Sequence, residues 1–253
     1  MDRSFLSKPQ VVAAARAFVC VRLATYEDPL EATWLKDFTR TGSGQLENTV
    51  FGILAPDGAK KLIRSSRGPD HLFSGPDQMA ETMAKIAAKY PNSTAPSRLP
   101  LVASVRLGLN IAAADNQPLV VVVGKDAATR KPLAAKLAGL AWNDEFLGRF
   151  TFAAGGPEDL ATIVGTKPEA GILIALPETF GRSAKSLAIV DADASTGRIA
   201  EALRGVVAGF SPIEKTFSNH VRSGHLQGIF WETAVPVTDP MELAARNRSK
   251  KKS

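Results

Sequence analysis

Cys20 is the only cysteine of the 253-residue chain. A single cysteine excludes an intramolecular disulfide and a metal site built from several thiolates. A thiolate in an exposed, electropositive place is a nucleophile, whereas a thiol among apolar neighbours is inert. Around Cys20, Val19, Val21 and Leu23 alternate with other residues in a stretch of strand composition. We therefore expect Cys20 to be buried and unreactive, and a one-cysteine nucleophile is the alternative.

The histidines offer little for metal binding. His220 and His225 lie five residues apart in a loop-like stretch, and the third histidine, His71, is far from them in the sequence. A zinc site at His220 and His225 would need carboxylates from elsewhere in the chain. Histidines of this kind are more often surface or packing residues, so we expect no bound metal, with these two as the candidate ligands.

Gly124 and Lys125 follow a run of valines and precede a helical pattern, which is the position of a phosphate-binding loop. The spacing Gly-x-x-x-x-Gly-Lys-Ser/Thr is absent, so no nucleotide is predicted. Helix amides with Lys125, Arg130 and Lys131 could still hold an anion. Neither a Gly-x-Ser-x-Gly nor a His-Glu-x-x-His motif occurs. The acidic pairs at 158–159 and 191/193 are typical of turns and caps, so we expect no cofactor.

Composition indicates a soluble globular protein. Hydrophobic residues make up 45% and charged residues 22%, and no apolar run reaches the length of a membrane span. Residues 1–10 do not resemble a signal peptide, so the chain as written is expected in the cytoplasm, or in an exported compartment if the natural N-terminus is longer. Five of the six net positive charges come from a basic tail, which is either solvated or contacts nucleic acid or another anionic surface: Arg246, Arg248, Lys250, Lys251 and Lys252.

Hydrophobic periodicity predicts alternating helices and strands in two segments. The first segment is expected to contain helices at residues 7–18, 29–38 and 76–90 and strands at 18–24, 49–54 and 61–64. The second is expected to contain helices at residues 101–115, 127–140 and 197–210 and strands at 119–123, 149–153, 171–176 and 186–190. Two strands adjoin without a helix between them, which indicates an α/β protein with a mixed sheet.

A linker separates the two segments. Residues 91–100 contain three prolines together with asparagine, serine and threonine, a composition typical of linkers. We therefore expect one domain over residues 1–92, a second over residues 100–212, and a C-terminal extension with the basic tail over residues 213–253.

The order of elements in both segments resembles the thioredoxin-like superfamily. In the first segment, the sequence "NTVFGILAPDGAKKLIR" at residues 48–64 resembles the strand, turn and strand that precede the last helix of that fold. In the second segment, "RLGLNIAAADNQPLVVVVG" resembles the helix and strand that lead to the active site, and "KPEAGILIALP" resembles the strand that the family introduces with a cis-proline, here Pro168. The resemblance implies two tandem thioredoxin-like units, the first lacking its N-terminal strand.

The chain departs from this family at the reactive motif. Thioredoxin-like enzymes carry Cys-x-x-Cys at the helix start after the central strand, where the thiol pKa is lowered. In the second unit this window, residues 124–132, contains no cysteine, and the first unit begins after the window. We expect a binding or accessory protein in thiol-redox or protein-quality processes, with a protein partner. The alternative is a thiol-disulfide oxidoreductase whose redox motif lies upstream of Met1.

One further segment has strand composition. In residues 228–235, Ile229, Trp231 and Thr233 alternate with other residues. Because an extended segment can add to an open sheet edge, we expect it to pack against the first unit near residues 18–24 and 49–54.

Overall fold

The computed structural model describes residues 2–39, 50–91, 98–230, 233–238, 243–244 and 247. The chain forms two compact units, one of residues 1–94 with 231–253 and one of residues 95–230. This division lies in the predicted linker, of which residues 92–97 fall outside the described residues. The expected extension at 213–253 is divided: residues 213–230 belong to the second unit and residues 231–253 to the first. The basic-tail residues Arg246, Arg248 and Lys250 to Lys252 also fall outside the described residues.

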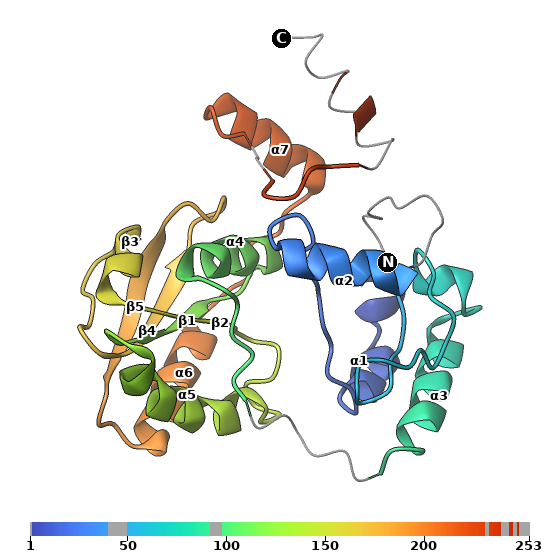
Figure 1. The fold of residues 1–253 in the computed structure, drawn as a ribbon, viewed down its shortest axis with the longest axis horizontal. Coiled ribbons are helices and arrows are strands. Elements are labelled where there is room, and N and C mark those ends of the chain that lie inside the picture. The colour runs from blue at the N-terminus through green and yellow to red at the C-terminus, as the bar shows by residue number, and fades with distance from the viewer. Residues whose placement is uncertain are drawn as a thin grey trace. The chain divides into compact units, whose positions relative to one another are not determined.

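A mixed sheet forms the centre of the second unit (Figure 1). Among the described residues its strand order is β2-β1-β4-β5-β3. β1 is parallel to β2 and antiparallel to β4, β4 is antiparallel to β5, and the short β3 is parallel to β5. The bounds are β1 (Leu119–Val123), β2 (Thr151–Gly155), β3 (Ile163–Val164), β4 (Gly171–Pro177) and β5 (Ala184–Asp191). The predicted mixed α/β architecture is thereby confirmed for this unit.

Helices cover both faces of the sheet (Figure 1). α5 (Ala127–Ala141) and α6 (Thr196–Gly209) bury apolar residues with Val120 and Val122 of β1, and α4 (Val105–Asp115) packs with Val121 and Val123 on the opposite face. Alternate strand residues point to opposite faces, so β1 is buried from both sides. Each of the three helices begins at a side-chain cap, which satisfies a free backbone N–H: Ser104, Asp126 and Ser195.

The first unit is built mainly from helices. They are the π-helix η1 (Asp2–Leu6), α1 (Pro9–Ala15), α2 (Pro29–Thr39), the 3-10 helix η2 (Pro69–His71) and α3 (Pro76–Ala87). A core joins η1, α1 and α3 around Phe5, Val11, Met79, Met83 and Ile86. Apolar residues spaced three and four apart on α3 explain this packing. Met79 and Met83 are core residues, as their helical spacing predicts.

The strands predicted in the first unit differ from the structure. Residues 50–54 and 61–66 pair through the antiparallel bridges Phe51–Ser66 and Leu54–Lys61 and through a hydrogen bond from the Leu62 N–H to the Ile53 carbonyl, without forming continuous strands. Residue 49 falls outside the described part of the chain. The strand predicted over residues 18–24 is wrong, because these residues have no regular structure, and Val21 is 74% exposed. A strand depends on hydrogen bonds to a neighbour. In the described residues of this unit no sheet supplies one.

The segment after residue 232 packs on the first unit, as expected. Val235 is buried beside Ala32 and Leu35 of α2, and its backbone N–H donates to the Tyr26 carbonyl at 2.9 Å. The described residues 233–238 do not form a strand, and Trp231 falls outside the described residues. The predicted contact is therefore present near Tyr26, but as side-chain packing with the Val235–Tyr26 backbone hydrogen bond rather than as strand pairing.

The stretch around His220 is helical rather than loop-like. α7 (Phe217–Leu226) follows α6 in the second unit. Among the described residues no helix is both long and apolar enough to span a membrane.

Candidate functional site at the start of helix α5

The start of α5 follows the buried strand β1, where the resemblance places a reactive motif. Asp126 is the N-cap residue, and its Oδ1 accepts hydrogen bonds from the Thr129 backbone N–H and from Thr129 Oγ1, both at 2.8 Å. The backbone hydrogen bond of Thr129 is the main reason why the pKa of Asp126 lies below its usual value. Asp126 and Thr129 are thus in contact at a spacing of three residues.

The loop before this helix is held by two hydrogen bonds to the backbone of Gly124. The Gly124 N–H donates to the Gly155 carbonyl at 3.1 Å, and Arg130 Nη1 donates to the Gly124 carbonyl at 2.7 Å. A Cβ at Gly124 would lie 2.9 Å from Thr129 Cγ2, so the close approach of loop and helix favours glycine here. These contacts tie the end of β1 to both β2 and α5.

The arrangement weakens the case for an anion site. The Asp126 carboxylate already occupies the helix N-terminus, where an anion would bind. Arg130 is engaged by the Gly124 carbonyl, and Lys125 and Lys131 are exposed. Of the three predicted anion-binding residues, Arg130 instead stabilises the loop through its hydrogen bond to the Gly124 carbonyl.

The neighbouring strand ends border this site. Val123 of β1 pairs with Gly171 of β4, three residues after Pro168. The described chain contains no cis peptide bond, so Pro168 is trans and half-buried rather than cis as the resemblance implies. The Gly156 N–H donates to Asp159 Oδ2 at 2.8 Å at the start of the 3-10 helix η3 (Pro157–Leu160), so Asp159 is a cap, as predicted.

Cys20 lies in the first unit and is exposed, which contradicts the expectation that it is buried in a strand. The failure of residues 18–24 to form a strand explains the difference. Nearby protein atoms nevertheless desolvate the thiol and raise its pKa. A raised pKa leaves less thiolate at neutral pH, so exposure does not make Cys20 an activated nucleophile.

The two candidate metal ligands lie on α7 and point in different directions. Five residues along a helix correspond to a rotation of about 140°. The His220 ring packs on Phe180 with ring centres 4.9 Å apart, and the His225 ring stacks on Phe230 at 5.2 Å. Within the described ranges no group of three or more His, Cys, Asp or Glu side chains could hold a metal ion.

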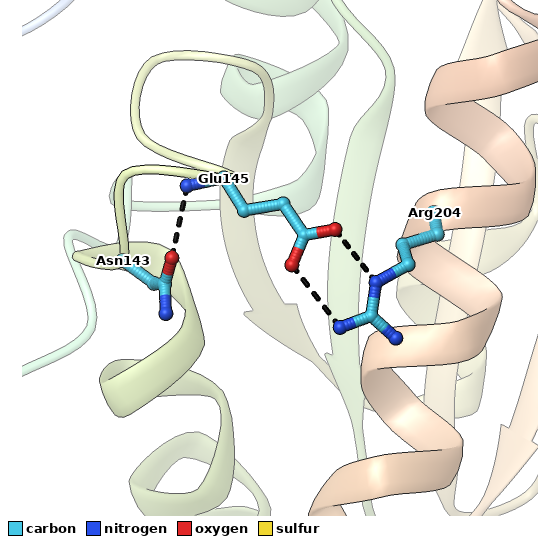
Figure 2. A network of polar contacts seen from close by, with 3 residues as sticks. All are labelled: Asn143, Glu145 and Arg204. Atoms are coloured by element: carbon cyan, nitrogen blue, oxygen red, sulfur yellow. Dashed lines mark hydrogen bonds and ion pairs between the residues drawn. The ribbon is translucent and has the colours of Figure 1, made fainter.

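A bidentate ion pair connects the C-terminal side of α5 with α6 (Figure 2). Arg204 Nε donates to Glu145 Oε1 at 2.6 Å and Arg204 Nη2 donates to Oε2 at 3.1 Å, while the Glu145 N–H donates to Asn143 Oδ1 at 2.9 Å. The hydrogen bond from Arg204 lowers the pKa of Glu145. These contacts orient the connection after α5 against α6, on the face of the sheet that α5 covers.

Sequence reasoning missed the contact of Asp126 with Thr129. The signal was present, because Asp before an apolar helical pattern with a hydrogen-bonding residue three positions later is typical of a helix start. In comparisons with known proteins, no family model, no curated protein and no solved structure matches this chain.

Proposed function

We propose that the second unit is a thioredoxin-like binding module without dithiol chemistry, acting on a protein partner in thiol-redox or protein-quality processes. Its element order supports this proposal: a parallel pair β1–β2 joined through α5, then the antiparallel pair β4–β5, then the closing helix α6. This is the order on which the resemblance rests. The proposal concerns the second unit alone.

The observation that carries the proposal is the pair Asp126 and Thr129. A redox dithiol of the Cys-x-x-Cys type lies at a helix N-terminus, with two residues between its cysteines. Asp126 and Thr129 have this spacing and this position, and their side chains touch. On this proposal a capping hydrogen bond takes the position of the disulfide, and the unit keeps a binding surface without a thiol.

Installing the dithiol tests the assignment of the site. In a Cys20→Ser background, the double variant Asp126→Cys/Thr129→Cys should form an intramolecular disulfide and reduce insulin faster than dithiothreitol alone. The matched control Asp126→Cys/Thr129→Ser has one thiol and should lack both properties. The unchanged chain should not exceed dithiothreitol. Failure of the two cysteines to pair, or turnover by the unchanged chain, would overturn the proposal.

Binding is tested separately at the same surface. Ala127 and Ala128 are exposed in the first turn of α5. The intact protein should bind a fluorescent, reduced and carboxymethylated polypeptide in an anisotropy titration, and Ala128→Arg should weaken that binding. Ala135→Arg is the control, because Ala135 is exposed on the same helix face two turns further along. Absence of binding, or equal loss in both variants, would contradict a binding role for this surface.

A further inference from the structure

The segment between α6 and α7 is attached to the second unit by polar contacts. Asn116, which ends α4, donates through Nδ2 to the Ile213 carbonyl at 2.7 Å and accepts from the Ile213 N–H at 3.2 Å. Lys215 Nζ donates to the Ala113 carbonyl at 2.6 Å and lies 3.5 Å from the Thr179 carbonyl. These contacts place the start of α7 beside the turn between β4 and β5.

α7 itself has a small area of apolar contact. Phe217 and Leu226 are each 83% exposed, and Gly224 is its one buried residue. The packing of the His220 ring on Phe180, with an angle of 33° between the ring planes, is its aromatic contact with the β4–β5 turn. A helix held by so few buried groups opens at a low free-energy cost.

We propose that α7 is an acid-sensitive lid, docked on Phe180 while His220 is neutral and released when His220 takes up a proton. The lid is defined as α7, residues 217–226. Its release uncovers Phe180, while the contacts of Ile213 and Lys215 keep the segment before α7 attached.

The surroundings of His220 favour its neutral form in the docked state. Burial of the ring is the main cause that lowers its pKa, the positive charge of Lys215 adds to this effect, and the negative charge of Glu178 opposes it. Glu178 is itself engaged, since its carboxylate accepts from the backbone N–H groups of Phe180 and Arg182. Burial also lowers the pKa of Lys215.

Other ionisable groups lie on α7 and on the segment that precedes it. Arg222 Nη2 donates to Asn219 Oδ1 at 2.8 Å, His225 stacks on Phe230, and Glu214 precedes Lys215.

The direction of the pH effect follows from linkage. A base whose pKa is lower in the docked than in the released helix binds a proton more readily after release. Docking is therefore strongest above the usual histidine pKa of about 6.5 and weakens as the pH falls below that value. Because the pKa of His220 is lower in the docked helix, protonation shifts the opening equilibrium toward the released helix as the pH falls.

Hydrogen exchange of the full chain tests the lid. Peptides covering residues 217–226 should exchange several-fold faster at about pH 5 than at about pH 7.5, after correction for the intrinsic pH dependence of exchange. Peptides of α6 serve as the internal reference and should show no such change. Equal corrected rates at both pH values would overturn the proposal.

Variants separate titration from packing. His220→Phe keeps an aromatic ring against Phe180 without a titrating group, so α7 should remain protected at both pH values. His225→Gln removes the exposed histidine of the same helix and should leave the pH dependence intact. A pH dependence that survives His220→Phe, or disappears in His225→Gln, would contradict the assignment to His220. A proton titration of the His220 ring by NMR at or above the usual pKa would also contradict it.

Discussion

At the scale of single residues, the backbone conformation of Gly171 is important for the pairing of the central strands in the second unit. Gly171 begins β4 with a φ of +140°, a conformation that side chains rarely adopt, and a Cβ there would lie 2.4 Å from the Val190 carbonyl oxygen. Because β4 lies between β1 and β5, a shift at this position would disturb two strand pairs at once.

We expect Gly171→Ala to destabilise the second unit by about 3 kcal/mol, because it combines backbone strain with a clash against a backbone oxygen. Chemical denaturation followed by circular dichroism measures the change. Gly139→Ala is the control: it lies inside α5 with open space around its Cβ position, and should be neutral or stabilising by up to about 1 kcal/mol. A Gly171 variant as stable as this control would contradict the strain argument.

At the level of elements, side-chain caps add to the apolar packing that holds α4, α5 and α6 in the second unit. Asp126 caps α5 through the Thr129 N–H, and Ser195 caps α6 through the Arg198 N–H. These caps satisfy backbone groups that would otherwise be unpaired at the helix starts.

Asp126→Ala should lower the melting temperature by a few degrees at neutral pH, whereas Asp126→Asn, which can still cap, should lower it less. Because the Asp126 pKa is lower in the folded chain, its contribution is present above its usual pKa of 3.8 and is lost as the pH falls below that value. The difference between the unchanged chain and Asp126→Ala should therefore shrink in acid. Scanning calorimetry across this pH range measures it, and a constant difference would contradict a charged cap.

The elements that were predicted correctly are those in which the local pattern of apolar residues agrees with their burial in the folded unit. β1 has the predicted bounds because all five of its residues are apolar and buried, and α5 extends only one residue beyond its predicted end. The alternation at residues 18–24 is an equally clear local pattern, but a strand also needs a partner. α7 was missed because serine, asparagine, histidine and glycine give it a low helical propensity.

The candidate site was predictable in position but not in chemistry. The valine run before Gly124 marks the end of a buried strand, and the helical pattern after it marks α5. Which polar side chain takes the helix N-terminus depends on rotamers and distances, which the pattern of residue types does not determine. The predicted burial of Cys20 was wrong for a related reason, because it was inferred from a strand that does not form.

At the scale of the whole molecule, the first unit depends on residues near both ends of the sequence. Val235 is 8% exposed and packs with Ala32 and Leu35 of α2. Removing two buried methyl groups costs both burial and packing.

Val235→Ala should destabilise the first unit by about 1–2 kcal/mol and leave the second unit unchanged. Hydrogen exchange under mild denaturant can compare peptides of α2 with peptides of α6. Val12→Ala is the matched control, because Val12 lies in the same unit and is 46% exposed, so its substitution should have little effect. Equal destabilisation of both units by Val235→Ala would contradict their independence.

Because residues 231–253 belong with residues 1–94, the second unit is an insertion within the first. This arrangement has a consequence during synthesis on the ribosome. Tyr26 and α2 are made early, but their contact Val235 is made only after the whole second unit. At about 5–20 residues per second, that delay is about 10–40 s, far longer than a helix needs to form. The inserted unit can therefore complete its folding while α2 still exposes the apolar surface of Ala32 and Leu35 that Val235 will cover.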